Sequence, residues 1–252
     1  FNKSIVEKVT IPASVTIVKS NAFTSCGSLK EVVFENKEDA KALTIETKAF
    51  EKCSKLEKVD LPARMVASTQ KLEVKEKDKS KTLLKDVEYS MDFDEKIFTS
   101  CSAIKEVNIV GTYANVAYSS NDGIIYNANG TKIIYCPKGR VNPVVMATKV
   151  TTIGAAAFYG CSKIEKVEVG APVTAIDEFA FAECSAVNDL TFKGTKDYNA
   201  LTIKFGAFLN NKMLTEVTLP ENLSSMDTCA FGGTALLKTV TLNSVGENGK
   251  VN

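Results

Sequence analysis

The chain of 252 residues contains no histidine and no tryptophan. Without histidine, Ser-His-Asp and Cys-His catalysis are excluded, and the commonest general base and metal ligand are missing. No apolar run approaches the ~20 residues of a transmembrane helix. Phosphate-binding glycine loops, nucleophile elbows and EF-hand spacings are also absent from the sequence. We therefore predict a protein that is not an enzyme and that holds no cofactor, no metal and no transmembrane segment.

A surplus of charge is missing as well, because 31 Lys and Arg residues face 30 Asp and Glu residues. Nucleic-acid binding needs a basic excess, so we expect no nucleic-acid partner. The hydrophobic share of 44% and the charged share of 24% are typical of a folded globular chain. Seven cysteines form an odd and therefore poor disulfide framework.

One short pattern is present many times, as in AFTSCGSLKEV, AFEKCSKLEKV and AFYGCSKIEKV from residues 22, 49 and 157. Its Phe recurs at 23, 50, 98, 158, 181, 208 and 231, which fits a unit of 23 residues with inserts. After each Phe come an apolar residue, a polar pair and an apolar–x–apolar triplet. These copies start at 6, 29, 56, 84, 104, 141, 164, 187, 214 and 237. Starts 6, 29 and 56 are matched by starts 158 residues later, so a whole block looks duplicated.

The triplet has the two-residue period of a strand with one face buried. A unit of ~23 residues cannot bury so much apolar surface alone, so the copies must stack with their strands parallel. We predict a single β-rich solenoid domain over 1–252, with about ten or eleven coils and all seven Phe residues in its core. A charged insert at 65–83 and a β-hairpin insert at 120–139 interrupt it. The chain opens inside a repeat, so we expect a fragment of a longer protein.

Five cysteines share one position of the repeat, which Asn211 and Thr234 occupy in later copies; they are Cys26, Cys53, Cys101, Cys161 and Cys184. Small residues that hydrogen-bond backbone groups predict a buried polar ladder, with disulfides or a metal site as the alternative. Cys136 and Cys229 lie off this position and are better candidates for reactive thiols than the other five, although free structural cysteines are the favoured interpretation for both. The polar pairs alternate in sign, as in Glu7-Lys8 and Lys30-Glu31, which predicts opposite charges on neighbouring coils.

The stretch VEKVTIPASVTIVKSNAFTSC at 6–26 resembles the repeat of BspA-like (Treponema pallidum-type) leucine-rich repeat surface proteins, L-x-x-V-x-I-P-x-x-V-x-x-I-x-x-x-A-F-x-x-C. The stretch at 120–139 resembles an insert between such repeats. The resemblance implies a right-handed leucine-rich-repeat superhelix. It also implies a secreted or cell-surface protein of a bacterium or parasitic protist that adheres to a protein or glycan partner, such as host extracellular matrix. We expect a monomer.

Partner contacts are expected where the regular pattern is interrupted. Tyrosines gather around the hairpin, at Tyr113, Tyr118, Tyr126 and Tyr135, and lysines gather in the charged insert, at Lys75, Lys77 and Lys79. Core packing is the alternative for the tyrosines, and a solvated loop is the alternative for the lysines. The residues between the inward apolar positions include no aromatic residue and no Arg, which favours the alternative function of a structural spacer presenting another domain.

Overall fold

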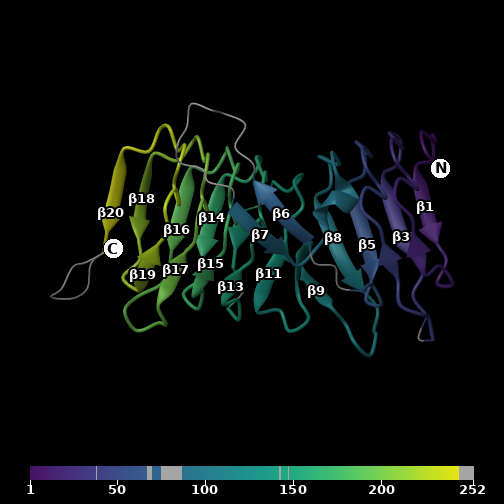
Figure 1. Ribbon diagram of the computed structural model, residues 1–252, viewed down its shortest axis with the longest axis horizontal. Helices are drawn as coiled ribbons and strands as arrows, with labels where there is room; N and C mark the ends of the chain where they lie inside the picture. Colours follow the sequence, from purple (N-terminus) through teal and green to yellow (C-terminus); the bar gives the residue numbers. More distant parts are fainter. Residues whose placement is uncertain (38, 67–69, 75–86, 142, 147, 244–252) are drawn as a thin grey trace. The chain divides into compact units, whose positions relative to one another are not determined.

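The computed structural model describes all residues except 38, 67–69, 75–86, 142, 147 and 244–252 (Figure 1). The chain forms two compact units. Unit 1 contains Phe1–Ser68 and Phe93–Val141, and unit 2 contains Thr69–Asp92 and Asn142–Asn252. The expectation of one domain over 1–252 stays a prediction.

Unit 1 is built on a sheet of four parallel strands in the order β1-β3-β5-β8. Its strands are β1 (Lys8–Ile11), β3 (Glu31–Phe34), β5 (Lys58–Pro62) and β8 (Glu106–Val110). Two short strands, β2 (Ile17–Val18) and β4 (Thr44–Ile45), pair in parallel on a second side of each coil. The 3-10 helix η1 (Glu95–Phe98) precedes β8.

The predicted hairpin is confirmed in unit 1. Strand β10 (Ile124–Asn127) pairs antiparallel with β9 (Tyr118–Asn121) and with β11 (Lys132–Tyr135). The turn closes with the Gly130 N–H donating to the Asn127 carbonyl at 2.9 Å.

Unit 2 repeats the arrangement of parallel strands. One sheet has the order β12-β14-β16, formed by β12 (Val144–Val145), β14 (Lys166–Val169) and β16 (Asp189–Phe192). The second side carries β13 (Thr152–Ile153), β15 (Ala175–Ile176), β17 (Leu201–Ile203) and β19 (Leu223–Met226). Strands β18 (Glu216–Leu219) and β20 (Thr239–Leu242) form a separate parallel pair.

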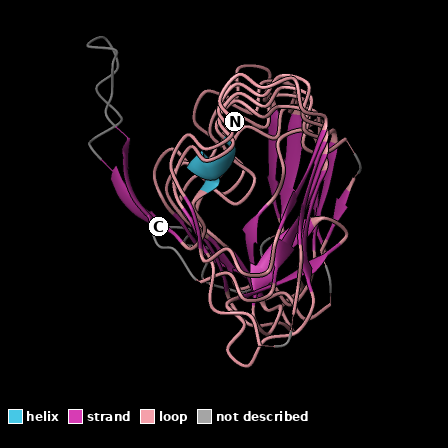
Figure 2. Ribbon diagram, turned by 90° about the vertical axis from the view of Figure 1, so that its right-hand side faces the viewer, coloured by secondary structure: helices cyan, strands magenta, loops and turns pink. Residues whose placement is uncertain are grey.

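The registers follow the repeat. Each apolar position of one coil lies beside the same position of the next, as in the series Val9, Val32, Val59 and Val107. The result is a β-solenoid of about nine turns with parallel strands and almost no helix, which confirms the predicted fold class. Figure 2 shows the strands on the flanks of the coils and the turns and loops that connect them. Among the described residues, no helix has the length and apolarity that a membrane span requires.

The repeat copy that sequence reasoning placed at Leu84 is wrong, which accounts for the smaller number of turns. Its strand β7 (Val87–Met91) pairs antiparallel with β6 (Gln70–Val74) of the charged insert, so these two strands form a local antiparallel pair and not a coil. Strand β5 pairs directly with β8, so no coil is inserted between them. The copy at Val141 is confirmed, because Val144 lies in register with Val167.

The repeat phenylalanines form the centre of the core. Their rings stack from coil to coil, with centroids 5.0 Å apart for Phe23 and Phe50, and 5.3 Å apart for Phe181 and Phe208. Six of the seven are buried. Phe231 is only half-buried, which corrects the expectation for that residue. It lies in the last repeat copy, so its ring stacks on Phe208 on one side, at 4.8 Å, and on no later repeat Phe on the other.

Candidate binding surfaces

The five repeat cysteines are buried and form no disulfides, which confirms their predicted placement. At three junctions between coils, the ladder thiol donates a hydrogen bond to the backbone carbonyl of a Phe residue in the preceding coil. The Cys53 Sγ lies 3.1 Å from the Phe23 oxygen, Cys101 lies 2.9 Å from that of Phe50, and Cys184 lies 3.0 Å from that of Phe158. These thiols therefore tie coils together.

Burial raises the pKa of the Cys184 thiol, and the neighbouring Cys161 raises it further. Burial likewise raises the pKa of the Cys26 thiol. A hydrogen bond with Cys53 lowers the pKa of the Cys101 thiol. A catalytic cysteine needs solvent access as well as a lowered pKa, and all five ladder thiols are buried, so their burial argues against a nucleophile.

Asn211 occupies the ladder position in a later coil and fits it poorly. Its side chain is fully buried, yet neither its amide nitrogen nor its amide oxygen has a hydrogen-bond partner. Thr234 takes the same position in the last copy and donates to the Phe231 carbonyl at 2.6 Å.

The two cysteines off the ladder differ in exposure. Cys136 lies in the core with 1% of its surface exposed. Cys229 is half-buried in a turn, with a φ of 58°. The reactivity expected of these two thiols stays a prediction, and Cys229 is the more accessible of the two.

Opposite charges meet across the early coil junctions, as the alternating polar pairs predict. The Lys30 Nζ lies 3.0 Å from a Glu7 carboxylate oxygen, and the Lys8 Nζ lies 2.9 Å from Glu31. A third pair joins Lys105 and Glu57 at 3.0 Å. These exposed pairs arrange neighbouring coils but leave little unpaired charge on this face for a partner.

The three hairpin tyrosines predicted to contact a partner lie in the core: Tyr118, Tyr126 and Tyr135 are all buried. The Phe93 ring packs edge-on against Tyr118 at 5.7 Å and stacks on Tyr135 at 5.0 Å. Burial raises the pKa of Tyr126. A partner on the folded surface would therefore contact Tyr113, which is half-buried, rather than these three. Lys75, Lys77 and Lys79 lie outside the described residues.

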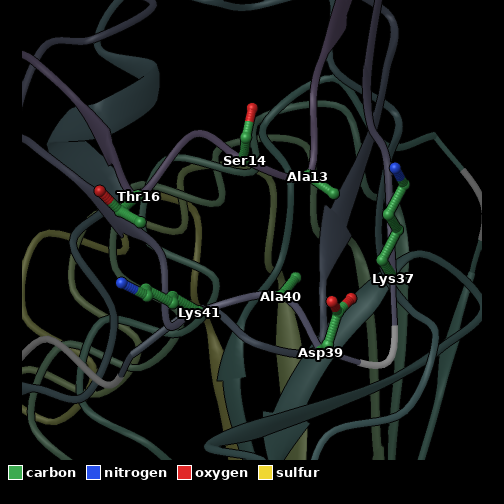
Figure 3. A pocket seen from close by; sticks show the side chains of 7 residues that line it. All are labelled: Ala13, Ser14, Thr16, Lys37, Asp39, Ala40 and Lys41. Carbon is green, nitrogen blue, oxygen red and sulfur yellow. The ribbon is translucent and has the colours of Figure 1, made fainter.

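A surface hollow of about 390 Å³ lies in unit 1 between two loops of adjacent coils (Figure 3). One loop contributes Ala13, Ser14 and Thr16, and the other contributes Lys37, Asp39, Ala40 and Lys41. In Figure 3, Lys41 lies beside Thr16 on one side, and Lys37 lies above Asp39 on the other. The mixture of hydroxyls with charges of both signs suits a polar partner.

Arg64 holds these two loops in place. Its Nη1 donates to the Val15 carbonyl at 2.9 Å and to the Lys41 carbonyl at 2.8 Å, and its side chain is fully buried. Its Nε and Nη2 have no hydrogen-bond partner. Burial lowers the pKa of Arg64, and the nearby Tyr113 acts in the opposite direction. Arg64 therefore joins the two loops of the hollow and also lies within electrostatic range of Tyr113.

Sequence reasoning missed the structural role of Arg64 and Arg140. They are the only arginines in a lysine-rich chain, and both are buried. Arg140 donates from Nη1 to the Asp122 carbonyl at 2.6 Å and from Nη2 to the Asp122 carboxylate, which fixes the turn between β9 and β10. The sequence could have indicated this role through its two arginines, because a planar guanidinium suits buried contacts with several acceptors better than a Lys ammonium does.

A second hollow, of about 310 Å³, lies in unit 2 between β16 and β18. Asp189 and Thr191 line it from one strand, and Glu216 and Thr218 from the other. The Thr191 hydroxyl is buried there without a hydrogen-bond partner. Over the described ranges of the chain, no three His, Cys, Asp or Glu side chains gather as a metal site would require.

A protein-family model described as the BspA type leucine rich repeat region matches residues 1–124 and 134–249, in six copies. No curated protein matches the chain significantly. The solved structure of the pneumococcal vaccine antigen PcpA matches with a TM-score of 0.64 and 22% identity, covering 94% of this chain and 51% of that one. A leucine-rich repeat protein from Eubacterium ventriosum matches with a TM-score of 0.50 and 15% identity, covering 94% and 66%.

These two structures support the fold alone, and the chain spans about half the length of the pneumococcal protein. The family match extends over nearly all of the repeat copies recognised in the sequence. The chain therefore belongs to the BspA-type leucine-rich repeat family.

Proposed function

We propose that this chain is a non-enzymatic recognition module of a secreted or cell-surface bacterial protein, and that it binds a protein or glycan partner such as host extracellular matrix. Membership of the BspA-type family supports this proposal, as does the likeness in fold to a bacterial vaccine antigen. The observation that carries it is the polar hollow of Figure 3, held open between adjacent coils by the buried Arg64.

The proposed contact surface consists of this hollow together with Tyr113, and the lysines of the charged insert are a separate proposed contact. Interface anchors are often Tyr side chains, whereas charges at the rim mainly raise the association rate. We accordingly assign Tyr113 and the hollow to affinity, and Lys75, Lys77 and Lys79 to electrostatic attraction.

The test is a binding assay of the intact chain against immobilised matrix proteins and a glycan array. We expect a saturable interaction that Lys37→Glu with Lys41→Glu weakens on the order of tenfold, which corresponds to about 1.4 kcal/mol. The matched control is Lys55→Glu with Lys212→Glu, which makes the same charge change at two exposed lysines elsewhere. Thermal melting of each variant checks that it is folded. Equal weakening by both double variants would move the contact away from the hollow.

A structural spacer that presents another domain is the second candidate function. The outward strand positions favour it, because they carry short polar residues such as Thr10, Thr191 and Thr218. Absence of binding to every matrix protein and glycan in the same assay would establish this reading over the first.

A further inference from the structure

A third hollow, of about 460 Å³, lies in unit 1 beside η1 and is larger than the two described above. Three lysines and one glutamate surround it: Lys48, Lys96, Lys138 and Glu95. Phe98, Cys101 and Tyr135 also line it, and Thr99 and Ser100 complete it with two hydroxyls. Its volume is in the usual range for a small-molecule site.

The hollow lies where the regular stacking of turns ends in unit 1. In earlier coils, the residue two places after the repeat Phe donates its N–H to the following turn, as Ser25 does to Glu51 at 2.7 Å and Lys52 to Thr99 at 2.8 Å. Ser100 occupies the same place with a φ of 60°, but its N–H finds no acceptor within the described part of the chain. The hairpin follows instead of a further turn, and the Tyr135 ring lies 6.5 Å from that of Phe98.

The charges around the hollow favour an anion. Lys138 is neutralised by Glu95, whose carboxylate oxygen lies 2.9 Å from the ammonium nitrogen. Lys48 and Lys96 are exposed and form no ion pair with any described residue. Two positive charges therefore remain next to an unpaired backbone N–H, and such a concave positive site concentrates anionic ligands.

We propose that this hollow binds the carboxylate or sulfate of an acidic sugar. Lys48, Lys96 and the Ser100 N–H would receive the anionic group through charge-assisted hydrogen bonds. The Thr99 hydroxyl donates to the Lys96 carbonyl at 2.9 Å, so its lone pairs accept from a sugar hydroxyl. Glu95 supplies a second acceptor and disfavours a ligand that carries several charges. The site deepens the proposed function, because it assigns a glycan class to the module.

The experiment titrates the intact chain with glucuronic acid, galactose 6-sulfate, glucose and inorganic sulfate, using calorimetry and amide NMR shifts. We expect both sugar acids to bind with shifts at Thr99 and Ser100, and we expect glucose and sulfate to bind on the order of tenfold more weakly or not at all. Raising the salt concentration should weaken the binding of the acids.

Lys48→Glu with Lys96→Glu should abolish binding of the sugar acids, whereas the control Lys212→Glu with Lys238→Glu should keep it. Sulfate that binds as tightly as the sugar acids would reduce the hollow to a simple anion site and overturn the sugar assignment. Unchanged binding in the Lys48 and Lys96 variant would also overturn it. A chain that binds matrix protein but no acidic sugar would defeat this inference and leave the proposed function standing.

Discussion

The coils that contain β5 and β18 carry the same repeat 158 residues apart, but they join their preceding coils differently. Strand β5 continues a parallel ladder from β3, with Glu31, Val32 and Val33 in register with Lys58, Val59 and Asp60. Strand β18 pairs with β20, and no ladder joins it to β16 among the described residues. The hollow of about 310 Å³ occupies the gap.

Two substitutions between the blocks explain the gap. Lys58, which faces Glu31, is replaced by Glu216, which would face Asp189 if the ladder continued. Like charges directly opposite one another disfavour strand pairing. Cys53, whose thiol binds the preceding coil, is replaced by Asn211, whose buried amide is unpaired. The apolar residues of these two coils are equally buried: Leu56, Val59 and Leu61 in one, and Leu214, Val217 and Leu219 in the other. These residues therefore place each coil, whereas the polar neighbours decide whether the ladder closes.

The largest expected effect comes from matched cavities in the two blocks. Leu61→Ala should cost about 2–5 kcal/mol of unfolding free energy, because Leu61 is fully buried under a closed ladder. Leu219→Ala at the equivalent position should cost less, because β18 is free on one side to close on the cavity. Urea unfolding of both variants measures the difference. An equal or larger loss for Leu219→Ala would show that the open junction is as rigid as the closed one.

Restoring the ladder thiol should have the next largest effect. Asn211→Cys removes an unpaired buried amide and supplies a donor for the preceding coil, so we expect a gain of about 1–3 kcal/mol in unfolding free energy. The reciprocal change Cys53→Asn should cost a similar amount. Denaturant titration under reducing conditions measures both, and a neutral Asn211→Cys variant would contradict this explanation of the gap.

Reversing the charge in β18 should have a smaller effect. Glu216→Lys places opposite charges beside Asp189 and should add about 0.5–1 kcal/mol of stability. Amide hydrogen exchange in β18 should slow if the ladder closes. Asp197→Lys makes a similar charge change at an exposed loop residue and serves as the control. If hydrogen exchange in β18 slows in the Asp197→Lys control but not in Glu216→Lys, the charge at position 216 does not control strand pairing.

The smallest effect is expected for the outermost ion pairs, which the two blocks share. Lys8 pairs with Glu31 at 2.9 Å, and its counterpart Lys166 pairs with Asp189 at 2.8 Å. The hydrogen bond to Asp189 raises the pKa of Lys166, so its small contribution is present below about pH 10.5 and is lost above that pH. Lys8→Ala and Lys166→Ala should lower the melting temperature slightly and equally at low salt. Unequal losses would show that the blocks differ here too, and losses that persist in molar salt would show that the effect is not electrostatic.

The repeat alone was enough to predict the parallel strands, the phenylalanine stack and the thiol ladder, because each depends on residues that recur at fixed spacing. The Leu84 copy misled because a short apolar alternation fits a local hairpin as well as a coil. The hairpin tyrosines looked like surface anchors because sequence shows where aromatic residues gather but not which way they face. The hollows could not be predicted. Two of them form where the coil ladders are interrupted, the third lies between loops held by Arg64, and each depends on residues that do not recur with the repeat.

Tension along a stack of coils concentrates on the junction that the fewest backbone hydrogen bonds cross, because each coil contacts only its neighbours. Between the coils of β16 and β18, the strands β17 and β19 still pair, and Phe181 and Glu183 donate their N–H groups to the turn that contains Phe208. The missing third ladder makes this junction weaker than the one between the coils of β14 and β16, where both strand ladders and the turn bonds are present. Under shear, unit 2 should therefore open at the β16–β18 junction before it opens at the β14–β16 junction.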